Sequence, residues 1–422
     1  MKVGLISFHS FLQPGGVKQH ILGLHKEFKK QGICSKIIVP RRSKSENYGK
    51  DVILLGTSFP LNFSGSRSDF CINFNPLAIR EVLEKEKFDV LHFHNFGFPS
   101  AFQILEWSKS LNVLTFHANV EGSEFLKNFP IFLYILEKIA QWKIDGIIGV
   151  APFNLAPFKN YKGPKAVIPN GIDLEEFNPQ GSKMKKFTDD KINPFDKLRV
   201  NPEQCRRINI LFLGRIEERK GLIYLLKAYK ILTKNPTPNF GGGLRLIIVG
   251  EGPLRNNCRN WAEKNKLKNV VFEGKIDEKI APSYYRTADI YCSPAIYGES
   301  FGVVLIEAMA SGVPVVAFAN QGYKEFLKGK KGAFLVKSKD YQALAQKIKI
   351  LIKDSGLRKE MGEWGLSEAQ NYSWSKIAAQ VLDFYQLCAK EKQKRKPKSF
   401  SIDKIIKKIY NKDILNWLKW PK

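Results

Sequence analysis

Apolar residues along the chain fall into two alternating patterns, short continuous runs and longer segments with apolar positions every three or four residues. Short runs bounded by turn residues indicate buried strands, whereas the wider spacing indicates amphipathic helices. In the first half, the pattern predicts a helix over residues 17–31 and strands over residues 3–8, 35–39, 51–55, 90–94, 113–117, 146–150 and 166–168. This alternation is typical of a doubly wound, mostly parallel α/β sheet.

The second half repeats the same order of elements. A helix is predicted from Leu222, with strands over residues 209–213, 244–249, 270–272, 290–293 and 315–317. A chain of 422 residues exceeds what one core usually organises, so two domains are expected. We assign a Rossmann-like domain to residues 1–177, a polar linker to residues 178–208 and a second Rossmann-like domain to residues 209–371, with strand ends facing each other across a cleft.

Composition narrows the class of protein. The chain is 44% hydrophobic and 12% aromatic, as expected for a globular protein with sizeable cores. Its six cysteines form no CxxC pair and are interpreted as free thiols in a reducing compartment. The pattern contains neither a signal-peptide run nor an apolar run of membrane-spanning length, which favours a cytoplasmic location.

The net charge of +28 indicates an acidic partner. Basic residues become denser in the tail over residues 390–422, where apolar residues including Trp417 and Trp420 recur at helical spacing. This pattern predicts an amphipathic helix with a basic face, for which an anionic membrane surface is the favoured partner. A solvated tail and a nucleic-acid patch are the alternatives, and no nucleic acid is expected as a partner because no common nucleic-acid motif is visible.

Two carboxylates, Glu299 and Glu307, stand eight residues apart around a helix that the apolar spacing predicts over residues 303–310 and that we expect to start near Ser300. The free N–H groups at a helix start bind anions, and Gly302 allows a phosphate to approach the backbone closely. Glu307 is expected about two turns inside this helix, and both carboxylates can accept hydrogen bonds from sugar or ribose hydroxyls. By itself, such a pair favours a capped, solvated helix, so other motifs must support a binding site.

Two further motifs follow predicted first strands. Gly15 and Gly16 can bring backbone N–H groups against an anion, although a glycine pair alone also fits a tight turn. Arg215 and Lys220 follow the strand over residues 209–213, where two cations can neutralise a diphosphate. Taken alone, this segment is also compatible with a solvated charged turn.

Three histidines, His92, His94 and His117, close two strands of the first half. His92 and His94 share one strand face, but no third ligand has the spacing usual for zinc, so no metal site is predicted. His117 stands at a strand end before a polar loop and is placed to hydrogen-bond a substrate. His92 is expected to be a satisfied core histidine.

The order of these motifs resembles a family 4 retaining glycosyltransferase of GT-B fold, over about residues 1–388. The segments that carry the resemblance are Gly15-Gly16-Val17 and residues 89–94, 115–117, 168–173, 212–215, 249–252 and 298–307. Within that family, Ser10-Phe11 and residues 115–117 and 298–302 are similar to phosphatidylinositol mannosyltransferases. The helix over residues 372–389 resembles the family's closing helix, which crosses back to the first domain, and leaves residues 390–422 as an additional tail.

The resemblance implies transfer of a hexose, with mannose from GDP-mannose as the favoured donor, without a metal and without a cofactor. In this interpretation Arg215 and Lys220 bind the diphosphate, Glu299 binds the donor sugar and His117 orients it beside the reacting carbon. The leaving phosphate oxygen takes the acceptor proton, so no protein base is required. Other donor-binding residues would be Gly15, Gly16, Ile276, Ser300, Phe301, Gly302, Val303 and, for the ribose, Glu307.

The acceptor side departs from the phosphatidylinositol enzymes, which carry an acidic residue where Leu12 stands and a basic one near Gly122. We therefore name other residues for an anionic lipid acceptor, namely Lys18, His20 and Arg67. The leading hypothesis is a peripheral membrane enzyme with a lipid-linked or glycan acceptor. The alternatives are the same fold with a UDP-sugar donor and a soluble or polysaccharide acceptor, and a non-catalytic module that binds nucleotide or nucleic acid.

Overall fold

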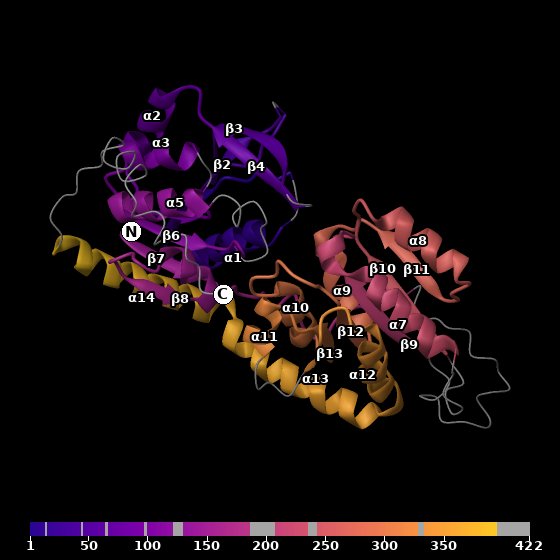
Figure 1. The fold of residues 1–422 in the computed structure, drawn as a ribbon. Helices are drawn as coiled ribbons and strands as arrows, with labels where there is room; N and C mark the ends of the chain where they lie inside the picture. Colours follow the sequence, from indigo (N-terminus) through magenta and orange to yellow (C-terminus); the bar gives the residue numbers. More distant parts are fainter. Residues whose placement is uncertain are drawn as a thin grey trace. The chain divides into compact units, whose positions relative to one another are not determined.

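The computed structural model describes residues 1–12, 15–43, 45–63, 66–96, 99–120, 130–185, 207–234, 243–327 and 333–394. The chain divides into two compact units. The first unit contains residues 1–171 together with residues 374–422, and the second contains residues 172–373. Figure 1 shows the elements of both units.

The described part of the first unit contains an eight-stranded sheet with the order β4-β3-β2-β1-β5-β6-β7-β8. Its strands are β1 (Lys2–Ser7), β2 (Cys34–Arg41), β3 (Val52–Phe63), β4 (Ser66–Ile72), β5 (Val90–His94), β6 (Leu111–Phe116), β7 (Gly146–Gly149) and β8 (Lys165–Val167). All neighbours pair in parallel except β3 and β4, which are antiparallel. Because β2 and β5 lie on opposite sides of β1, the carboxyl ends of β1 and β5 form a topological switch point, where α/β sheets bind ligands.

The first unit includes the last described helix, although more than two hundred residues separate it from the rest of that unit. The helices of the unit are α1 (Gly16–Lys30), α2 (Pro76–Glu86), α3 (Ser100–Trp107), α5 (Pro130–Lys143), the 3-10 helix η1 (Pro152–Phe158) and α14 (Trp374–Gln393). Glycines make room for α14. A Cβ at Gly23 would lie 2.0 Å from Trp374, and one at Gly146 would lie 2.1 Å from Cys388 Sγ. A larger residue at either position would push α14 away from the unit.

The described part of the second unit contains a six-stranded parallel sheet with the order β11-β10-β9-β12-β13-β14. Its strands are β9 (Ile208–Leu213), β10 (Leu244–Val249), β11 (Val270–Gly274), β12 (Ile290–Ser293), β13 (Val315–Phe318) and β14 (Ala333–Val336). The helical segments are η4 (Glu218–Lys220), α7 (Leu222–Lys234), α8 (Arg255–Lys264), η5 (Glu278–Ile280), α9 (Ala281–Thr287), α10 (Val303–Ala310), α11 (Gln321–Leu327), α12 (Tyr341–Lys353), α13 (Ser355–Ala369) and η6 (Gln370–Tyr372). The switch point of this sheet lies between β9 and β12.

The predicted fold class, two doubly wound Rossmann-like domains, is confirmed. How the two domains face each other stays a prediction. The hydrophobic pattern missed β4 and β14. β4 is an edge strand that begins with the polar residues Ser66, Arg67 and Ser68, so it lacks the continuous apolar run of a central parallel strand.

Of the predicted linker over residues 178–208, the structure describes residues 178–185 and 207–208. Residues in the first of these segments contact α9. The Arg286 guanidinium donates hydrogen bonds to the carbonyl oxygens of Glu176 and Ser182 at 3.1 and 3.0 Å. The Met184 N–H donates to Thr287 Oγ1 at 2.8 Å. The basic tail is described only as far as residue 394, so the predicted amphipathic helix beyond it lies outside the described residues. None of the described helices is both long and apolar enough to cross a membrane.

Candidate functional site

Three loops meet at the carboxyl edge of the second sheet because glycines let their backbones touch. After β9, the chain continues through Gly214 to η4 and Gly221. A Cβ at Gly250, which follows β10, would lie 1.9 Å from the Gly214 carbonyl oxygen. Gly221 has a left-handed φ of 67°, and a Cβ there would lie 2.0 Å from the carbonyl oxygen of Pro294, which follows β12. These contacts place the charged turn after β9 beside the loop after β12.

The charged turn forms an ion cluster with the first of the two predicted carboxylates. Lys220 Nζ and Arg219 Nη1 lie 2.7 and 2.8 Å from Glu299 Oε1. Glu217 contacts Arg219 at 2.5 Å and the half-exposed Arg215 at 3.3 Å. Burial acts to raise the pKa of Glu299, but Lys220 and Arg219 outweigh it and hold this pKa below its ordinary value. The cluster therefore keeps an ionised carboxylate beside several cations.

The loop before α10 is held by packing against α11. Gly298 and Gly302 both adopt left-handed conformations, with φ of 77° and 87°. A Cβ at Gly322 of α11 would lie 2.3 Å from the Glu299 carbonyl oxygen, so this helix lies directly against the loop. The Phe301 ring lies 5.0 Å from that of Phe326 between centroids. The N–H groups at the start of α10 are thus carried by a fixed backbone.

The predicted helix over residues 303–310 is confirmed as α10, but its expected start near Ser300 is about three residues too early. α10 begins at Val303, because the left-handed Gly302 occupies the position before its first turn. Glu307 is therefore slightly more than one turn inside the helix and not two turns.

Glu307 is bound by a tyrosine that the motif analysis did not identify. The Tyr285 hydroxyl donates a hydrogen bond to Glu307 Oε2 at 2.7 Å. The Tyr285 ring itself packs against Tyr291 with centroids 5.3 Å apart. Burial raises the pKa of Glu307 to about 7, and the hydrogen bond from Tyr285 opposes that rise. Glu307 is therefore poised between its neutral and ionised forms near neutral pH.

The first unit brings three histidines together at the switch point of its sheet. His94 ends β5, His117 directly follows β6, and His20 comes from α1. His94 Nδ1 lies 3.2 Å from His117 Nε2, and the His20 ring lies 5.1 and 4.9 Å from the rings of His94 and His117. Burial lowers the pKa of His20 to about 4 and the pKa values of His94 and His117 well below their ordinary range. All three imidazoles are neutral at physiological pH.

His92 lies behind this cluster and is satisfied by two hydrogen bonds. Its Nε2 lies 2.6 Å from Thr115 Oγ1, and its Nδ1 lies 2.7 Å from the Tyr385 hydroxyl. The expectation of a satisfied core histidine is confirmed.

The remaining predicted site residues lie in both units. Gly15 precedes α1 and Gly16 begins it, and the half-buried Lys18 has its ammonium 5.9 Å from the Phe11 ring centroid. Arg67 pairs with Asn62 in the β3–β4 hairpin, and its side chain lies outside the described residues. Ile276 is half-buried between β11 and η5.

Sequence reasoning missed several residues of these sites, including Arg219, Glu217, Tyr285 and the contact of His20 with His94 and His117. Arg219 had a local signal, because it stands beside Lys220 in the same charged turn. Tyr285 had none, because it lies 22 residues before its partner Glu307. His20 lies 74 residues before His94, and only the packing of α1 on the sheet joins them.

Two parallel-sheet units with polar residues at the carboxyl ends of their central strands define the GT-B class, and solved structures agree with this assignment. A sucrose-phosphate synthase from Thermosynechococcus elongatus matches 91% of this chain and 98% of its own, with a TM-score of 0.70 at 20% identity. The HepE protein of Anabaena, solved with UDP and glucose, matches 92% of this chain and 99% of its own, with a TM-score of 0.66 at 18% identity.

Sequence comparisons define the family. The family model for Glycosyltransferase Family 4 matches residues 14–176, and the model for Glycosyl transferases group 1 matches residues 196–367. The phosphatidyl-myo-inositol mannosyltransferase of Mycobacterium leprae is 30% identical over 398 residues, which cover 92% of this chain and 97% of that protein. The protein of the same name from Mycobacterium tuberculosis is 31% identical over 400 residues, with the same two coverages. The chain therefore belongs to glycosyltransferase family 4 and is a glycosyltransferase.

Proposed function

We propose that this enzyme transfers a mannosyl residue from GDP-mannose to a lipid-linked or glycan acceptor at an anionic membrane surface, with retention of configuration and without a metal. The observation that carries the proposal is the similarity to phosphatidyl-myo-inositol mannosyltransferases, which extends over 92% of the chain. The geometry of the second unit supports it, because the start of α10, whose N–H groups suit a phosphate, and a cation cluster lie on one sheet edge.

In this proposal the diphosphate of the donor binds the cations after β9 and the N–H groups at the start of α10. Lys220 and Arg215 neutralise the charge that develops on the leaving phosphate. Arg219, which contacts both Glu217 and Glu299, keeps the turn in place. The cluster is therefore assembled before the donor arrives, which reduces the reorganisation needed in the transition state.

The two carboxylates bind hydroxyl groups. Glu299 stays ionised beside Lys220 and Arg219, and an ionised carboxylate only accepts hydrogen bonds. This form suits the hydroxyls of the transferred sugar. Glu307 accepts hydrogen bonds from the ribose, with Tyr285 holding its other oxygen in place. The donor is thus held at three points, and catalysis comes mainly from positioning and charge stabilisation.

His117 contributes a neutral imidazole that orients the transferred sugar. Its burial keeps the ring uncharged, so it acts as a hydrogen-bonding group and not as a cation. The acceptor attacks from the face that the diphosphate leaves, and the leaving phosphate oxygen takes the acceptor proton. No protein base and no metal are needed for this sequence of bond changes.

A donor panel tests the proposal. Purified protein with acceptor lipid is incubated with GDP-mannose, UDP-glucose and UDP-N-acetylglucosamine, with and without EDTA, and the anomeric configuration of the product is determined by NMR. We expect turnover with GDP-mannose, retained configuration and no loss of turnover in EDTA. A protein that neither binds nor hydrolyses any of these donors would contradict the proposed enzymatic activity. Turnover with a UDP-sugar alone would contradict the donor assignment. Glu299→Ala should abolish turnover and leave the circular dichroism spectrum unchanged.

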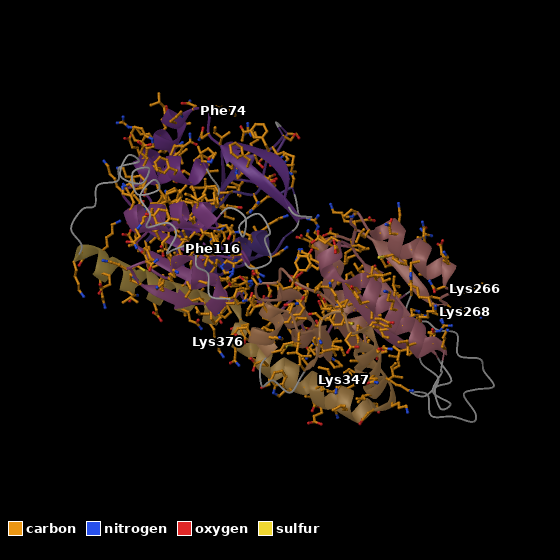
Figure 2. All side chains as sticks on the ribbon, in the orientation of Figure 1. Phe74, Phe116, Lys266, Lys268, Lys347 and Lys376 are labelled. Carbon is orange, nitrogen blue, oxygen red and sulfur yellow. The ribbon has the colours of Figure 1, made fainter. Side chains whose placement is uncertain are left out.

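An exposed apolar surface on the first unit supports the membrane part of the proposal. Phe74 and Leu77 are 71% and 60% exposed at the start of α2, and Figure 2 labels Phe74 at the surface of the first unit. Phe59 of β3 is 43% exposed, with its ring centroid 6.3 Å from that of Phe74. The same helix and its end carry exposed basic residues, namely Arg80, Lys85 and Lys87. Aromatic groups beside basic ones suit the headgroup region of an anionic bilayer.

Liposome flotation tests this surface and the basic tail separately. We expect wild-type protein to bind vesicles that contain anionic lipid, and the double substitution of Phe74 and Leu77 by Ser to weaken that binding. Ile350→Ser, at a position that is 41% exposed on α12, is the matched control. A deletion of residues 390–422 measures the contribution of the tail. Equal binding by all four proteins would show that neither segment contacts the membrane.

A further inference from the structure

The three imidazoles at the switch point of the first unit form a compact group of nitrogen ligands. One ring nitrogen of each of His20, His94 and His117 lies within 4.8 Å of the others, and all three side chains are buried. The group combines an α1 residue with residues at the ends of β5 and β6. Three histidines with an open fourth position are a common ligand set for zinc in enzymes.

His20 Nε2 is buried and has no hydrogen-bond partner among the described residues. Burying a polar atom without a partner is unfavourable, so such an atom calls for a ligand. This orphaned nitrogen is an observation independent of the short distances in the group. His94 Nε2 is also buried without a partner among the described residues, but His94 faces His117 through Nδ1, so its Nε2 is not a ligand atom of this group.

A neighbouring amide determines which nitrogen of His20 carries the proton. His20 Nδ1 lies 2.8 Å from Asn170 Oδ1. The amide oxygen only accepts hydrogen bonds, so Nδ1 carries the hydrogen and Nε2 carries the lone pair. A histidine that donates one N–H to an oxygen and offers its other nitrogen is the usual arrangement of a metal-bound imidazole.

The other two histidines have a separation that suits a shared ion. His94 Nδ1 and His117 Nε2 lie 3.2 Å apart. Two nitrogens bound tetrahedrally to one zinc at about 2.0–2.1 Å would be separated by about 3.3 Å. Neutral imidazole is the form that binds metals, and burial keeps these rings neutral by lowering the pKa of each. His92, held by Thr115 and Tyr385, packs on His94 with ring centroids 4.3 Å apart and limits its movement.

We propose that His20, His94 and His117 bind a divalent transition-metal ion, with Zn²⁺ the best match, and leave one coordination position for water or another oxygen ligand. Imidazole nitrogens favour zinc over Mg²⁺ and Ca²⁺, which prefer oxygen ligands. The binding rests only on the geometry of the first unit. A consequence for activity rests on the proposed function. An ion bound to His117 prevents this residue from contacting the sugar, and it therefore inhibits transfer reversibly.

The binding experiment uses the full chain after treatment with a chelator. Zn²⁺ is titrated by calorimetry, and Co²⁺ is titrated with its visible absorption as a report of coordination. We expect one equivalent of each ion to bind to wild-type protein. His20→Gln should weaken Zn²⁺ binding by about 100-fold or more, and Asn170→Ala, which removes only the partner of His20, by about 10-fold or more. His25→Gln is the matched control, because His25 lies on the same helix and contacts Ser35 and not the cluster.

X-ray absorption of the zinc-loaded wild type provides a test without substitutions, in case a buried variant fails to fold. Three nitrogen ligands at about 2.0–2.1 Å are expected. Sulfur ligands, unchanged affinity in His20→Gln, or the absence of any stoichiometric binding would each overturn the site.

The activity experiment separates the two parts of the inference. Zn²⁺ should inhibit transfer by wild type and by His25→Gln, EDTA should restore it, and the residual activity of His20→Gln should resist Zn²⁺. Stoichiometric binding at this site without inhibition, or with activation, would overturn the inhibitory consequence alone. Zinc binding by a protein that transfers no sugar from any donor would contradict the proposed function and leave the metal site supported.

Discussion

The two units place polar residues at equivalent positions of their sheets, but the chemistry at the two positions is opposite. At the end of β9 in the second unit, the cations Lys220 and Arg219 surround the ionised carboxylate Glu299. At the ends of β5 and β6 in the first unit, buried imidazoles are kept neutral. One site is built from compensated charges, whereas the other is built from uncharged hydrogen-bonding groups.

This difference fits a division of labour in sugar transfer. A diphosphate carries its charge to the enzyme and gains charge as it leaves, so its binding site needs cations. A hexose is uncharged, and a neutral imidazole can hydrogen-bond it without attracting or repelling the phosphate. The same edge of a sheet thus carries charged groups in one unit and neutral polar groups in the other.

The largest expected effect is on the charged site. Lys220→Ala should lower kcat/KM by about 100-fold or more, because a preorganised cation on the leaving group is lost. Binding of the nucleoside diphosphate should weaken, and binding of the nucleoside without phosphates should not. Lys234→Ala, at the exposed end of α7, is the control and should behave as wild type. Equal weakening of nucleoside and nucleoside diphosphate would contradict a phosphate role for Lys220.

The neutral site should respond differently to salt. His117→Ala should lower kcat by about 10- to 100-fold through lost positioning of the sugar. Because the imidazole is uncharged, this loss should be the same at low and high ionic strength, whereas the effect of Lys220→Ala on donor binding should change with salt. His25→Ala is the control in the first unit. A salt-dependent loss in His117→Ala would show that the ring acts as a cation.

A glycine substitution should move the charged turn without removing any of its charges, and it therefore tests the geometry of this site separately from its charge. Gly221→Ala places a Cβ 2.0 Å from the Pro294 carbonyl oxygen at a φ of 67°, so the charged turn must move and kcat/KM should fall by about 10-fold. Gly32→Ala has a similar φ of 72° but nothing within 4 Å, so it should cost only about 1 kcal/mol of left-handed strain and no activity. Thermal unfolding and kinetics of both variants check the contrast. Unchanged activity in Gly221→Ala would show that the contact with Pro294 does not position Lys220.

The smallest expected effect concerns the pH dependence of donor binding. Burial raises the pKa of Glu307 from 4.5 to about 7, so its ionisation opposes folding, and stability is lost as pH rises from about 4.5 to about 7. The ionised form accepts ribose hydrogen bonds better, so KM for the donor should fall as pH rises through about 7.

Tyr285→Phe removes the hydrogen bond that opposes the shift, so the midpoint of this KM profile should move to higher pH and KM at neutral pH should rise a few-fold. Glu307→Gln should abolish the profile. Tyr229→Phe, which loses a buried hydroxyl bonded to carbonyl oxygens elsewhere in the second unit, should leave the midpoint unchanged. A midpoint that does not respond to Tyr285→Phe would show that Tyr285 does not control Glu307.

Central strands and motif positions were predictable, because a buried parallel strand is a continuous apolar run and site residues directly follow such strands. The runs over residues 90–94, 244–249 and 290–293 match β5, β10 and β12 in full. The polar edge strand β4 was not predictable by this signal, because edge strands need not be apolar on both faces. The start of α10 was misplaced because helical periodicity does not show that Gly302 adopts a left-handed conformation.

The sequence by itself determined the fold class and the family, and it predicted Glu299, Glu307, Lys220 and His117 as candidate site residues, because each of these stands in a local motif. Only the tertiary structure decided which partners complete them. Arg219 and Lys220 share one oxygen of Glu299, which lies 80 and 79 positions further along the chain, and Tyr285 donates a hydrogen bond to Glu307. His20 joins His94 and His117 because α1 packs on the sheet. Burial and distance, which control these pKa values and ligand sets, arise only when distant segments pack together.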